Sequence, residues 1–385
     1  MSFRKKIKNN VPRVALESIT TLVAGDIKTG KTRLWKEVTE MHYVKPEEAL
    51  LLAFEDGYET WELDEIIPLH AEGTDKDLWK VWEYFKKDVV PGLVKEAKEG
   101  RVAKLIGVDT ADRAIDACTA WVLNDRKRKY GKVFESIQDI SESTGGKENG
   151  WTALHDELKS AFDTLKNAGY GLFYLAWTKE RETTLYDGRK FNSLELAMSN
   201  TGRKVFASQA SLICCLHNEV NILNKDGEIL DDNAKSKSGK VLASNFHETK
   251  SMMYFRPSEF IGIAGGRFTD LPEKEEYSAE NFLKVFEEAV KGQLKKTTTS
   301  VEDLKKNEDV EKQEKADETA ERMEVISTEE LMKEIHAIIE NMNLAKKTKA
   351  AEGFEEAFGV RNYLQEKDNP TNLKKALEIV KDAAK

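Results

Sequence analysis

The chain has 385 residues, of which 40% are hydrophobic and 34% are charged, and its formal net charge is −9 at pH 7. This length predicts two or three domains, and the negative charge argues against a protein that coats DNA as histones do. The three cysteines, Cys118, Cys214 and Cys215, form no C-x-x-C pair, and the histidines lack ligand spacing. The composition therefore indicates neither a disulfide framework nor a structural zinc site, and it favours a reducing compartment.

Membrane insertion and secretion are not expected. The longest apolar runs, ALLLAF, GLFYLAW and ASLICCL, are far shorter than the roughly 20 residues that span a bilayer. The basic N-terminal sequence MSFRKKIKNNVPR is not followed by the apolar segment of a secretory signal. We therefore expect a cytoplasmic protein with no membrane partner.

Strands and helices are expected to alternate over about the first 270 residues. Leu34, Trp35 and Val38 lie at helical spacing, for example, directly after the apolar strand ITTLVA. The predicted strands are 19–24, 49–56, 102–110, 171–177 and 210–216, the predicted helices are 32–41, most of 58–100 and 151–169, and 218–230 is predicted as a hairpin around Asp226-Gly227. Buried strands separated by helices indicate an α/β fold with a mostly parallel sheet covered on both faces.

The composition changes after Lys291. Residues 293–326 contain almost no large apolar side chains and many charges of both signs, so we expect a charged linker or a solvated helix. Amphipathic patterning returns at Ser327, where the sequence STEE matches a capping box. The expected organisation is an α/β domain at 1–292, a linker at 293–326 and a small all-helical domain at 327–385.

The sharpest motif is GDIKTGKT, which has the G-x4-G-K-[ST] spacing of a phosphate-binding loop between a predicted strand and a predicted helix. Glycines allow the backbone to wrap around phosphates, lysine neutralises their charge, and the helix N-terminus favours an anion. The threonine hydroxyl is expected to bind Mg²⁺. The predicted nucleotide-binding residues are Gly25, Asp26, Ile27, Lys28, Thr29, Gly30, Lys31, Thr32 and Arg33, with ATP and Mg²⁺ as cofactors.

Acidic residues end two neighbouring predicted strands. Asp109 ends LIGVD, where a carboxylate is expected to help Thr32 hold the Mg²⁺ shell. Glu55 ends LLLAFE on the strand that lies between the loop strand and the Asp109 strand in the sequence. We expect Glu55 to position the attacking water, with Lys31 as the other catalytic residue and Asp56 as the alternative to Glu55.

In the order of these features, the sequence resembles the phage-type nucleotide-binding proteins of the RecA-like P-loop ATPase group, including phage single-strand annealing ATPases. The segments that match are GDIKTGKT, LLLAFEDG, KLIGVDTADRA, GYGLFYLAWTKERE, ASLICCLHNE and GGRFTDLPE, which together cover about residues 10–290. The resemblance implies a RecA-like fold, ATP and Mg²⁺ binding, and action on single-stranded DNA in recombination or replication. If the protein is phage-encoded, the cytoplasm is that of a bacterial host.

The resemblance also implies further site residues. A polar residue at the fourth strand tip senses the γ-phosphate in this class, and since Trp177 occupies that tip, Thr178 or Lys179 is expected to serve. Many members assemble as rings or filaments, in which a basic residue from a neighbouring subunit completes the active site. Arg256 and Arg267 are the candidates for that residue in this sequence.

Two basic segments, 122–150 and 180–205, correspond to the loops that reach DNA in RecA-like proteins. Each combines cations with aromatic residues, as single-stranded DNA binding requires. The candidate DNA-binding residues are Arg126, Lys127, Arg128, Lys129, Arg189 and Lys190. The helices at 327–385 are expected to dock a partner protein or to cap the assembly.

The sequence therefore predicts a Mg²⁺-dependent ATP-hydrolysing protein that acts on single-stranded DNA in recombination, annealing or repair. A helicase-type motor or helicase loader is an alternative, which DNA unwinding would distinguish. A non-hydrolysing, ATP-gated DNA-binding or scaffold protein is a second alternative, which phosphate release stimulated by DNA would exclude. No N-K-x-D motif was found, so the choice between ATP and another nucleoside triphosphate stays open.

Overall fold

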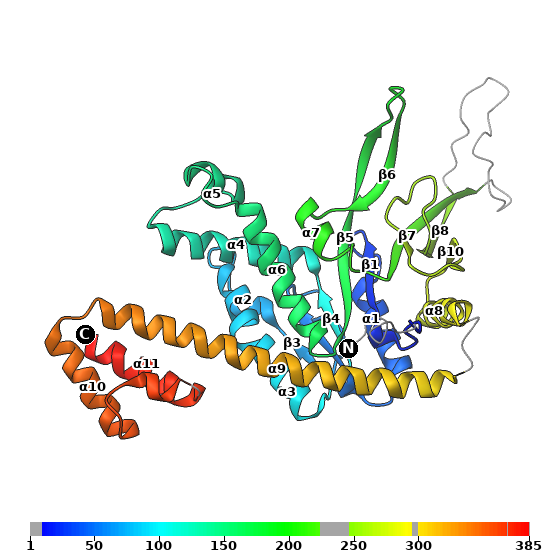
Figure 1. Cartoon of the computed structure of the whole chain (residues 1–385). Helices are drawn as coiled ribbons and strands as arrows, with labels where there is room; N and C mark the ends of the chain where they lie inside the picture. Colours follow the sequence, from blue (N-terminus) through cyan, green and yellow to red (C-terminus); the bar gives the residue numbers. More distant parts are fainter. Residues whose placement is uncertain (1–9, 224–245, 295–298, 368, 385) are drawn as a thin grey trace, which may run out of the picture. The chain divides into compact units, whose positions relative to one another are not determined.

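The structure is a computed structural model that describes residues 10–223, 246–294, 299–367 and 369–384 (Figure 1). It forms two compact units, Met1–Gln313 and Glu314–Lys385. Among the described helices, none is both long enough and apolar enough to cross a membrane.

The first unit is built on a mixed, mostly parallel sheet. Its strands follow the order β10-β8-β7-β1-β5-β4-β2-β3, and those from β7 to β3 are parallel to their neighbours, whereas β8 and β10 run antiparallel. The strands are β1 (Thr20–Gly25), β2 (Ala49–Ala53), β3 (Ile66–Ile67), β4 (Leu105–Asp109), β5 (Gly171–Thr184), β6 (Lys190–Leu196), β7 (Leu212–Leu223), β8 (Phe246–Tyr254), β9 (Gly265–Gly266) and β10 (Lys274–Glu276). The five strands expected from apolar runs are confirmed.

Helices cover both faces of this sheet. The helices of the first unit are α1 (Lys31–His42), α2 (Trp79–Tyr84), α3 (Val90–Gly100), α4 (Ala111–Tyr130), α5 (Ile137–Ser143), α6 (Gly150–Asn167), α7 (Asn200–Val205) and α8 (Ala279–Gln293). Successive β5 residues point to opposite faces. Phe173 contacts Trp35 of α1 and Phe282 of α8, whereas Tyr174 contacts Phe162 of α6. This alternation explains why the central strands are apolar throughout.

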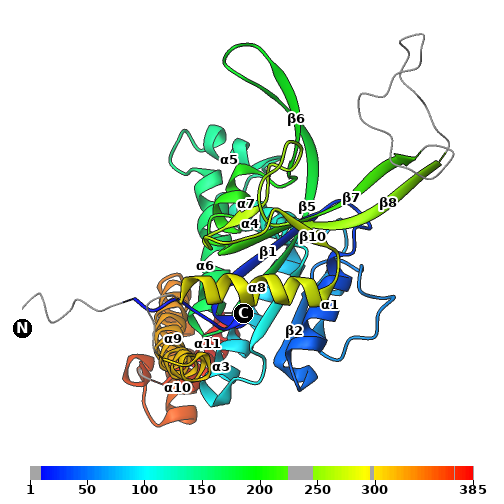
Figure 2. The same ribbon diagram turned by 90° about the vertical axis from the view of Figure 1, so that its right-hand side faces the viewer.

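The two basic segments differ from the expected loops. Residues 122–130 are the last turns of α4, and α5 follows them. Strand β5 continues past Trp177 to Thr184 and pairs with β6, so most of 180–205 is a β-hairpin followed by α7 (Figures 1 and 2). The Thr and Phe residues favour strands, and Asp187-Gly188 favours a tight turn, so this segment forms a hairpin. Its charges alone had indicated a loop.

The hairpin expected at 218–230 is also different. Strand β7 extends to Leu223, but its partner is β8, with Asn218 opposite Ser251 and Leu223 opposite Phe246. The turn expected at Asp226-Gly227 lies outside the described residues. A local turn signal predicted the wrong partner because strand pairing depends on where the returning chain can reach, not on the nearest Asp-Gly pair.

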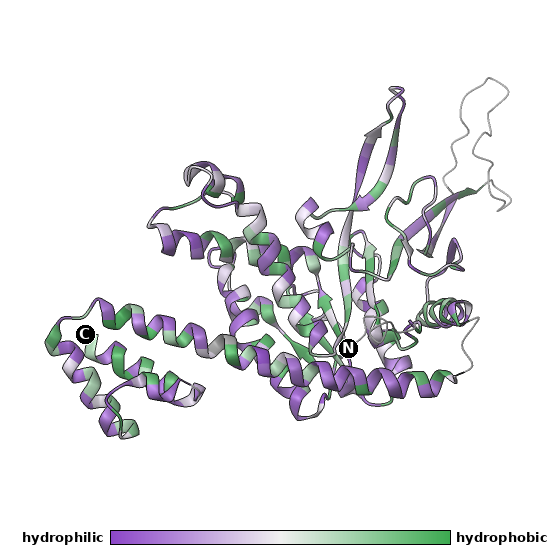
Figure 3. Cartoon of the chain, in the orientation of Figure 1, coloured by the Kyte–Doolittle hydropathy of each residue, from purple (hydrophilic) through white to green (hydrophobic). Residues whose placement is uncertain are grey.

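The expected charged linker contains most of a long helix, α9 (Val301–Glu340). The residues in the first part of this helix are mainly hydrophilic (Figure 3), yet Leu304, Glu308 and Lys312 are buried in the first unit. Leu304 joins the core cluster, and Glu308 accepts hydrogen bonds from the backbone of Val14. The three buried residues are spaced four apart, and two of them are charged. The average composition of 293–326 therefore did not indicate that one face of this helix packs on the core.

The second unit is a small helical bundle made by the end of α9, α10 (Leu344–Phe358) and α11 (Pro370–Ala384). Its core contains Ile335, Phe354 and Leu373. No helix begins at Ser327, because α9 is continuous there and the Thr328 hydroxyl donates to the Glu324 carbonyl one turn earlier. The capping-box prediction was therefore wrong: the preceding charged residues are already helical.

Candidate nucleotide-binding site

The predicted phosphate loop connects the carboxyl end of β1 to the first turn of α1. Lys28 and Gly30 have positive φ angles of 66° and 93°, which turn the chain sharply before α1 begins at Lys31. At Gly25, a Cβ atom would lie 2.4 Å from the Thr29 hydroxyl oxygen and 3.1 Å from Leu216 Cβ. Only glycine fits this close approach, and the loop and helix N-terminus together form an anion site.

Lys31 is held inside this loop. Its side chain is largely buried, and its ammonium group donates to the carbonyl oxygens of Gly25, at 3.1 Å, and Asp26, at 2.9 Å. Burial lowers the pKa of Lys31, and the nearby carboxylates of Asp109 and Glu55 oppose this effect. The charge is therefore placed where a phosphate would meet it.

Thr32 and Asp109 are the residues that would hold Mg²⁺. The Thr32 hydroxyl donates to Asp109 Oδ2 at 2.6 Å, while Asp109 Oδ1 is buried and has no hydrogen-bond partner in the described part of the chain. Burial raises the pKa of Asp109. An unpartnered buried carboxylate oxygen beside a hydroxyl fits Mg²⁺, which usually takes one or two protein ligands and completes its shell with phosphates and water.

Among the described residues, there is no group of three or more His, Cys, Asp or Glu side chains that could hold a metal ion by itself.

Glu55 lies beside these residues although it follows a different strand. The backbone amides of Phe54 and Glu55 donate to the Asp109 carbonyl at 2.6 and 3.1 Å, which ties the end of β2 to the end of β4. The Thr110 hydroxyl lies 3.4 Å from Glu55 Oε2. Burial and the negative charge of Asp109 raise the pKa of Glu55 to about 7. A carboxylate with this pKa is well suited to accept a proton from water near neutral pH.

The alternative residue, Asp56, is exposed. A Cβ atom built on Gly57 would lie 3.8 Å from Glu55 Oε1 and 3.9 Å from the Thr32 hydroxyl, so these two groups border the same space. The geometry therefore favours Glu55 over Asp56 as the base.

The two sensor candidates have different environments in the middle of β5, just past its last pair with β1, Gly25 opposite Trp177. Thr178 is buried and its hydroxyl has no partner among the residues that the structure describes, whereas Lys179 is exposed. Between Thr178 and Lys179, the geometry favours Thr178 as the group that a phosphate oxygen would satisfy.

Sequence reasoning missed Asp112, in the first turn of α4. Asp112 Oδ2 accepts a hydrogen bond from the Trp177 amide at 2.7 Å and so links α4 to the middle of β5. Burial raises the pKa of Asp112 to about 6. Its only sequence signal is its position three residues after Asp109.

The pKa of Glu55 predicts the pH dependence of the reaction. A base must be deprotonated, so kcat/KM for ATP hydrolysis should rise about tenfold per pH unit below about pH 7 and level off above it. Steady-state phosphate release from pH 5.5 to 8.5 measures this profile. Asp112→Asn should retain the acid limb; a limb that disappeared in this variant would assign the titration to Asp112.

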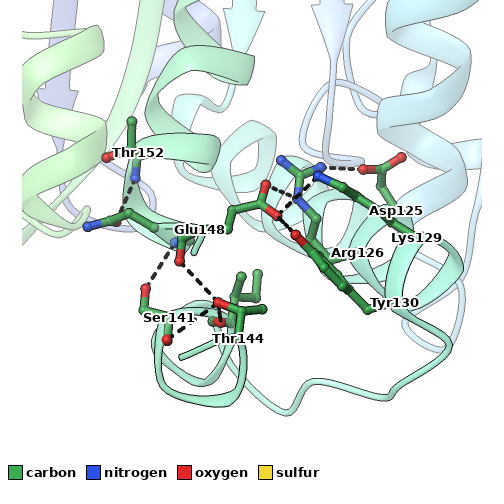
Figure 4. Close-up of polar contacts among 11 residues, drawn as sticks. Asp125, Arg126, Lys129, Tyr130, Ser141, Thr144, Glu148 and Thr152 are labelled. Carbon is green, nitrogen blue, oxygen red and sulfur yellow. Dashed lines mark hydrogen bonds and ion pairs between the residues drawn. The ribbon is translucent and has the colours of Figure 1, made fainter. Parts of the chain in front are cut away.

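The basic residues at 126–129 are largely paired with carboxylates, and Figure 4 shows the contacts of Arg126 and Lys129 with Glu148. Arg126 binds Asp125 and Glu148, and Lys129 and Tyr130 also contact Glu148. Arg128 lies 3.6 Å from Glu83 and over the Trp79 ring, and Lys127 is exposed. These pairs reduce the positive potential that the sequence alone indicated.

The remaining basic candidates are at the surface. Arg189 pairs with Asp187, and Lys190 pairs with Glu182 across the β5–β6 hairpin. Arg256 is exposed, and Arg267 is exposed with its guanidinium donating to the Ser208 carbonyl at 3.0 Å. Neither Arg256 nor Arg267 lies in the cluster around Lys31, so a role for either residue as a basic finger stays a prediction.

These features together define a P-loop nucleotide-binding domain. They are the phosphate loop, the hydroxyl and carboxylate that would hold Mg²⁺, and a glutamate of raised pKa, all on a mostly parallel α/β sheet. Residues 17–262 match the family model described as "AAA domain", and no curated protein matches the chain. Because this match covers well over half of the sequence, the chain belongs to that AAA domain family. Membership indicates nucleotide binding and ATPase activity, typically with Mg²⁺.

Proposed function

We propose that the protein hydrolyses ATP with Mg²⁺ and couples this reaction to handling of single-stranded DNA in recombination, annealing or repair. The observation that carries the ATPase part is the convergence of Lys31, Thr32, Asp109 and Glu55 at the carboxyl ends of β1, β4 and β2. The RecA-like and phage-type character of the protein belongs to this proposal and rests on the sequence resemblance.

Each residue has a distinct role in the proposed reaction. The Lys31 ammonium neutralises charge on the outer phosphates, and Thr178 donates a hydrogen bond to the transferred group. Glu55 accepts a proton from the attacking water. Thr32 and Asp109 would hold Mg²⁺, which neutralises charge as the phosphate bond breaks.

The DNA part of the proposal is supported by the β5–β6 hairpin. Strand β5 runs without interruption from Thr178, beside the phosphate loop, into this hairpin, which projects beyond the sheet (Figures 1 and 2). Tyr186 is fully exposed and Phe191 is 43% exposed. Exposed aromatic rings stack on unpaired bases regardless of sequence, and Arg181 adds an exposed cation on the same hairpin.

We extend the proposal to assembly. As in the group that the sequence resembles, a ring or filament would bring Arg256 or Arg267 of one subunit toward the site of the next. Residues 327–385 lie in the second compact unit, and we assign them to docking of a partner protein.

Replacing Tyr186 and Phe191 together with serine should weaken single-stranded DNA binding about tenfold or more, because loss of stacking costs about 1–3 kcal/mol per base. Anisotropy of a labelled oligothymidine at fixed salt measures the affinity, and phosphate release with and without DNA measures the coupling. Basal hydrolysis should not change, since neither ring lies in the nucleotide site.

The matched control replaces Arg128 and Lys129 with alanine and should have a smaller effect, because both cations are already paired with carboxylates. Lys31→Ala should lose phosphate release in all conditions. Hydrolysis that DNA does not stimulate would contradict the DNA part alone, and DNA unwinding would favour a helicase-type motor.

A further inference from the structure

Tyr277 lies against the phosphate loop and has no role in the chemistry described above. Its phenol donates a hydrogen bond to the Gly30 carbonyl at 2.9 Å. The contact is close: a Cβ atom on Gly30 would lie 2.9 Å from the Tyr277 oxygen and 3.2 Å from the nearest ring atom, Cζ. Burial raises the pKa of Tyr277, so the phenol stays neutral and would place no negative charge beside phosphates held by the loop.

Arg33 completes a pair with this ring. Its guanidinium carbon lies 5.6 Å from the centre of the Tyr277 ring, within the range of a cation–π contact. Glu37, one turn further along α1, fixes the guanidinium with a 2.7 Å ion pair. Arg33 is more than half exposed and Tyr277 is partly exposed, so the pair is accessible from solvent.

The sheet order shows on which side of the loop this pair lies. From β1, the carboxylates Asp109 and Glu55 lie in the direction of β4 and β2. Tyr277 lies in the opposite direction, since its amide donates to Ser251 of β8 and it follows β10. A triphosphate whose terminal group meets Glu55 must direct its nucleoside away from β4 and β2, toward the side of Arg33 and Tyr277.

We propose that the Arg33–Tyr277 pair is the subsite for the nucleotide base. An aromatic ring and a guanidinium plane bind a base by stacking, so the subsite favours purines over the smaller pyrimidines without reading a particular edge. This inference deepens the proposed ATPase function and rests on it. It assigns a role to Tyr277, which lies beyond the residues matched by the family model.

Calorimetric titration of the full-length protein with Mg²⁺ and ATP, UTP or inorganic tripolyphosphate tests the subsite. Tyr277→Leu, which keeps apolar volume against α1 but has no π face, should weaken ATP binding about tenfold and reduce the preference for ATP over UTP. Binding of tripolyphosphate, which has no base, should be unchanged. Tyr277→Phe should retain the ATP-over-UTP preference, since it loses only the bond to Gly30.

Two matched controls are available in the same unit. Tyr84→Leu alters a partly buried tyrosine on α2, and Lys36→Ala removes the Lys36–Glu40 pair, which has the same spacing on α1 as Arg33–Glu37. Neither should change the preference for ATP over UTP, whereas Arg33→Ala should reduce it.

Several outcomes would overturn the inference. Equal weakening of ATP and tripolyphosphate in Tyr277→Leu would show that the ring only supports the loop, and an unchanged ATP-to-UTP ratio would place the base elsewhere. Failure of the proposed ATPase function gives a different result from failure of the base subsite. If the ATPase function is wrong, Lys31→Ala should leave the binding of both ATP and tripolyphosphate unaffected.

Discussion

Replacing Glu55 with glutamine is expected to lower kcat for ATP hydrolysis by about 10²- to 10⁴-fold while ATP still binds. Glutamine has the same shape and can keep the contact with the Thr110 hydroxyl, but its amide cannot accept the proton of the attacking water. Loss of one negative charge beside Asp109 also removes repulsion between the two carboxylates. Affinity for ATP should therefore be equal to or higher than that of the wild type.

Phosphate release measures kcat in this variant, and calorimetry with a non-hydrolysable ATP analogue measures binding. Asp56→Asn is the matched control, because Asp56 is the exposed neighbour of Glu55, and its kcat should stay close to the wild-type value. Wild-type turnover in Glu55→Gln would assign the base to another residue.

Removal of the Glu308 carboxylate is expected to destabilise the first unit by about 2–4 kcal/mol. Glu308 is 5% exposed, and its two oxygens accept the backbone amides of Val14, at 2.8 Å, and Ala15, at 3.4 Å. Both amides are buried, so Glu308→Ala would leave two donors without partners. A buried donor without a partner costs about 1–3 kcal/mol.

Urea unfolding followed by tryptophan fluorescence measures this effect in the full chain. All seven tryptophans precede residue 178, so the signal reports the first unit and not the helical bundle. Glu302→Ala, at an exposed position on the same helix, should cost less than about 1 kcal/mol. Equal losses for the two variants would show that Glu308 does not hold the segment before β1.

The local features of the nucleotide site were accessible from sequence. The spacing from Gly25 to Thr32 is contiguous, and the apolar runs before Glu55 and Asp109 predicted strands that the structure confirms. In a parallel sheet, carboxyl ends of strands meet at one edge, so residues distant in sequence were expected to converge. Asp109 is the last residue of β4 and Glu55 lies two residues after the end of β2, so the apolar runs were enough to place both carboxylates at that edge.

Residues that act through contacts distant in the sequence were missed. Asp112 is one of several acids near Asp109, and only its hydrogen bond to Trp177 distinguishes it. Tyr277 approaches Gly30 from 247 positions away in the sequence. The ion pairs of the cations at 126–129 were also missed, because a charge run does not show that Glu83 and Glu148 lie beside it.

The sequence by itself determined the phosphate loop, the central strands and the class of chemistry, because these depend on local spacing and on alternation between apolar runs and turns. Only the tertiary structure decided that Glu55 is partly buried and close to Asp109, which together raise its pKa to about 7. It also decided that Glu308 and Lys312 of an apparently solvated segment are buried. The physical reason is the same for both: burial and pairing of a charged side chain are set by residues from other elements, which composition and periodicity do not encode.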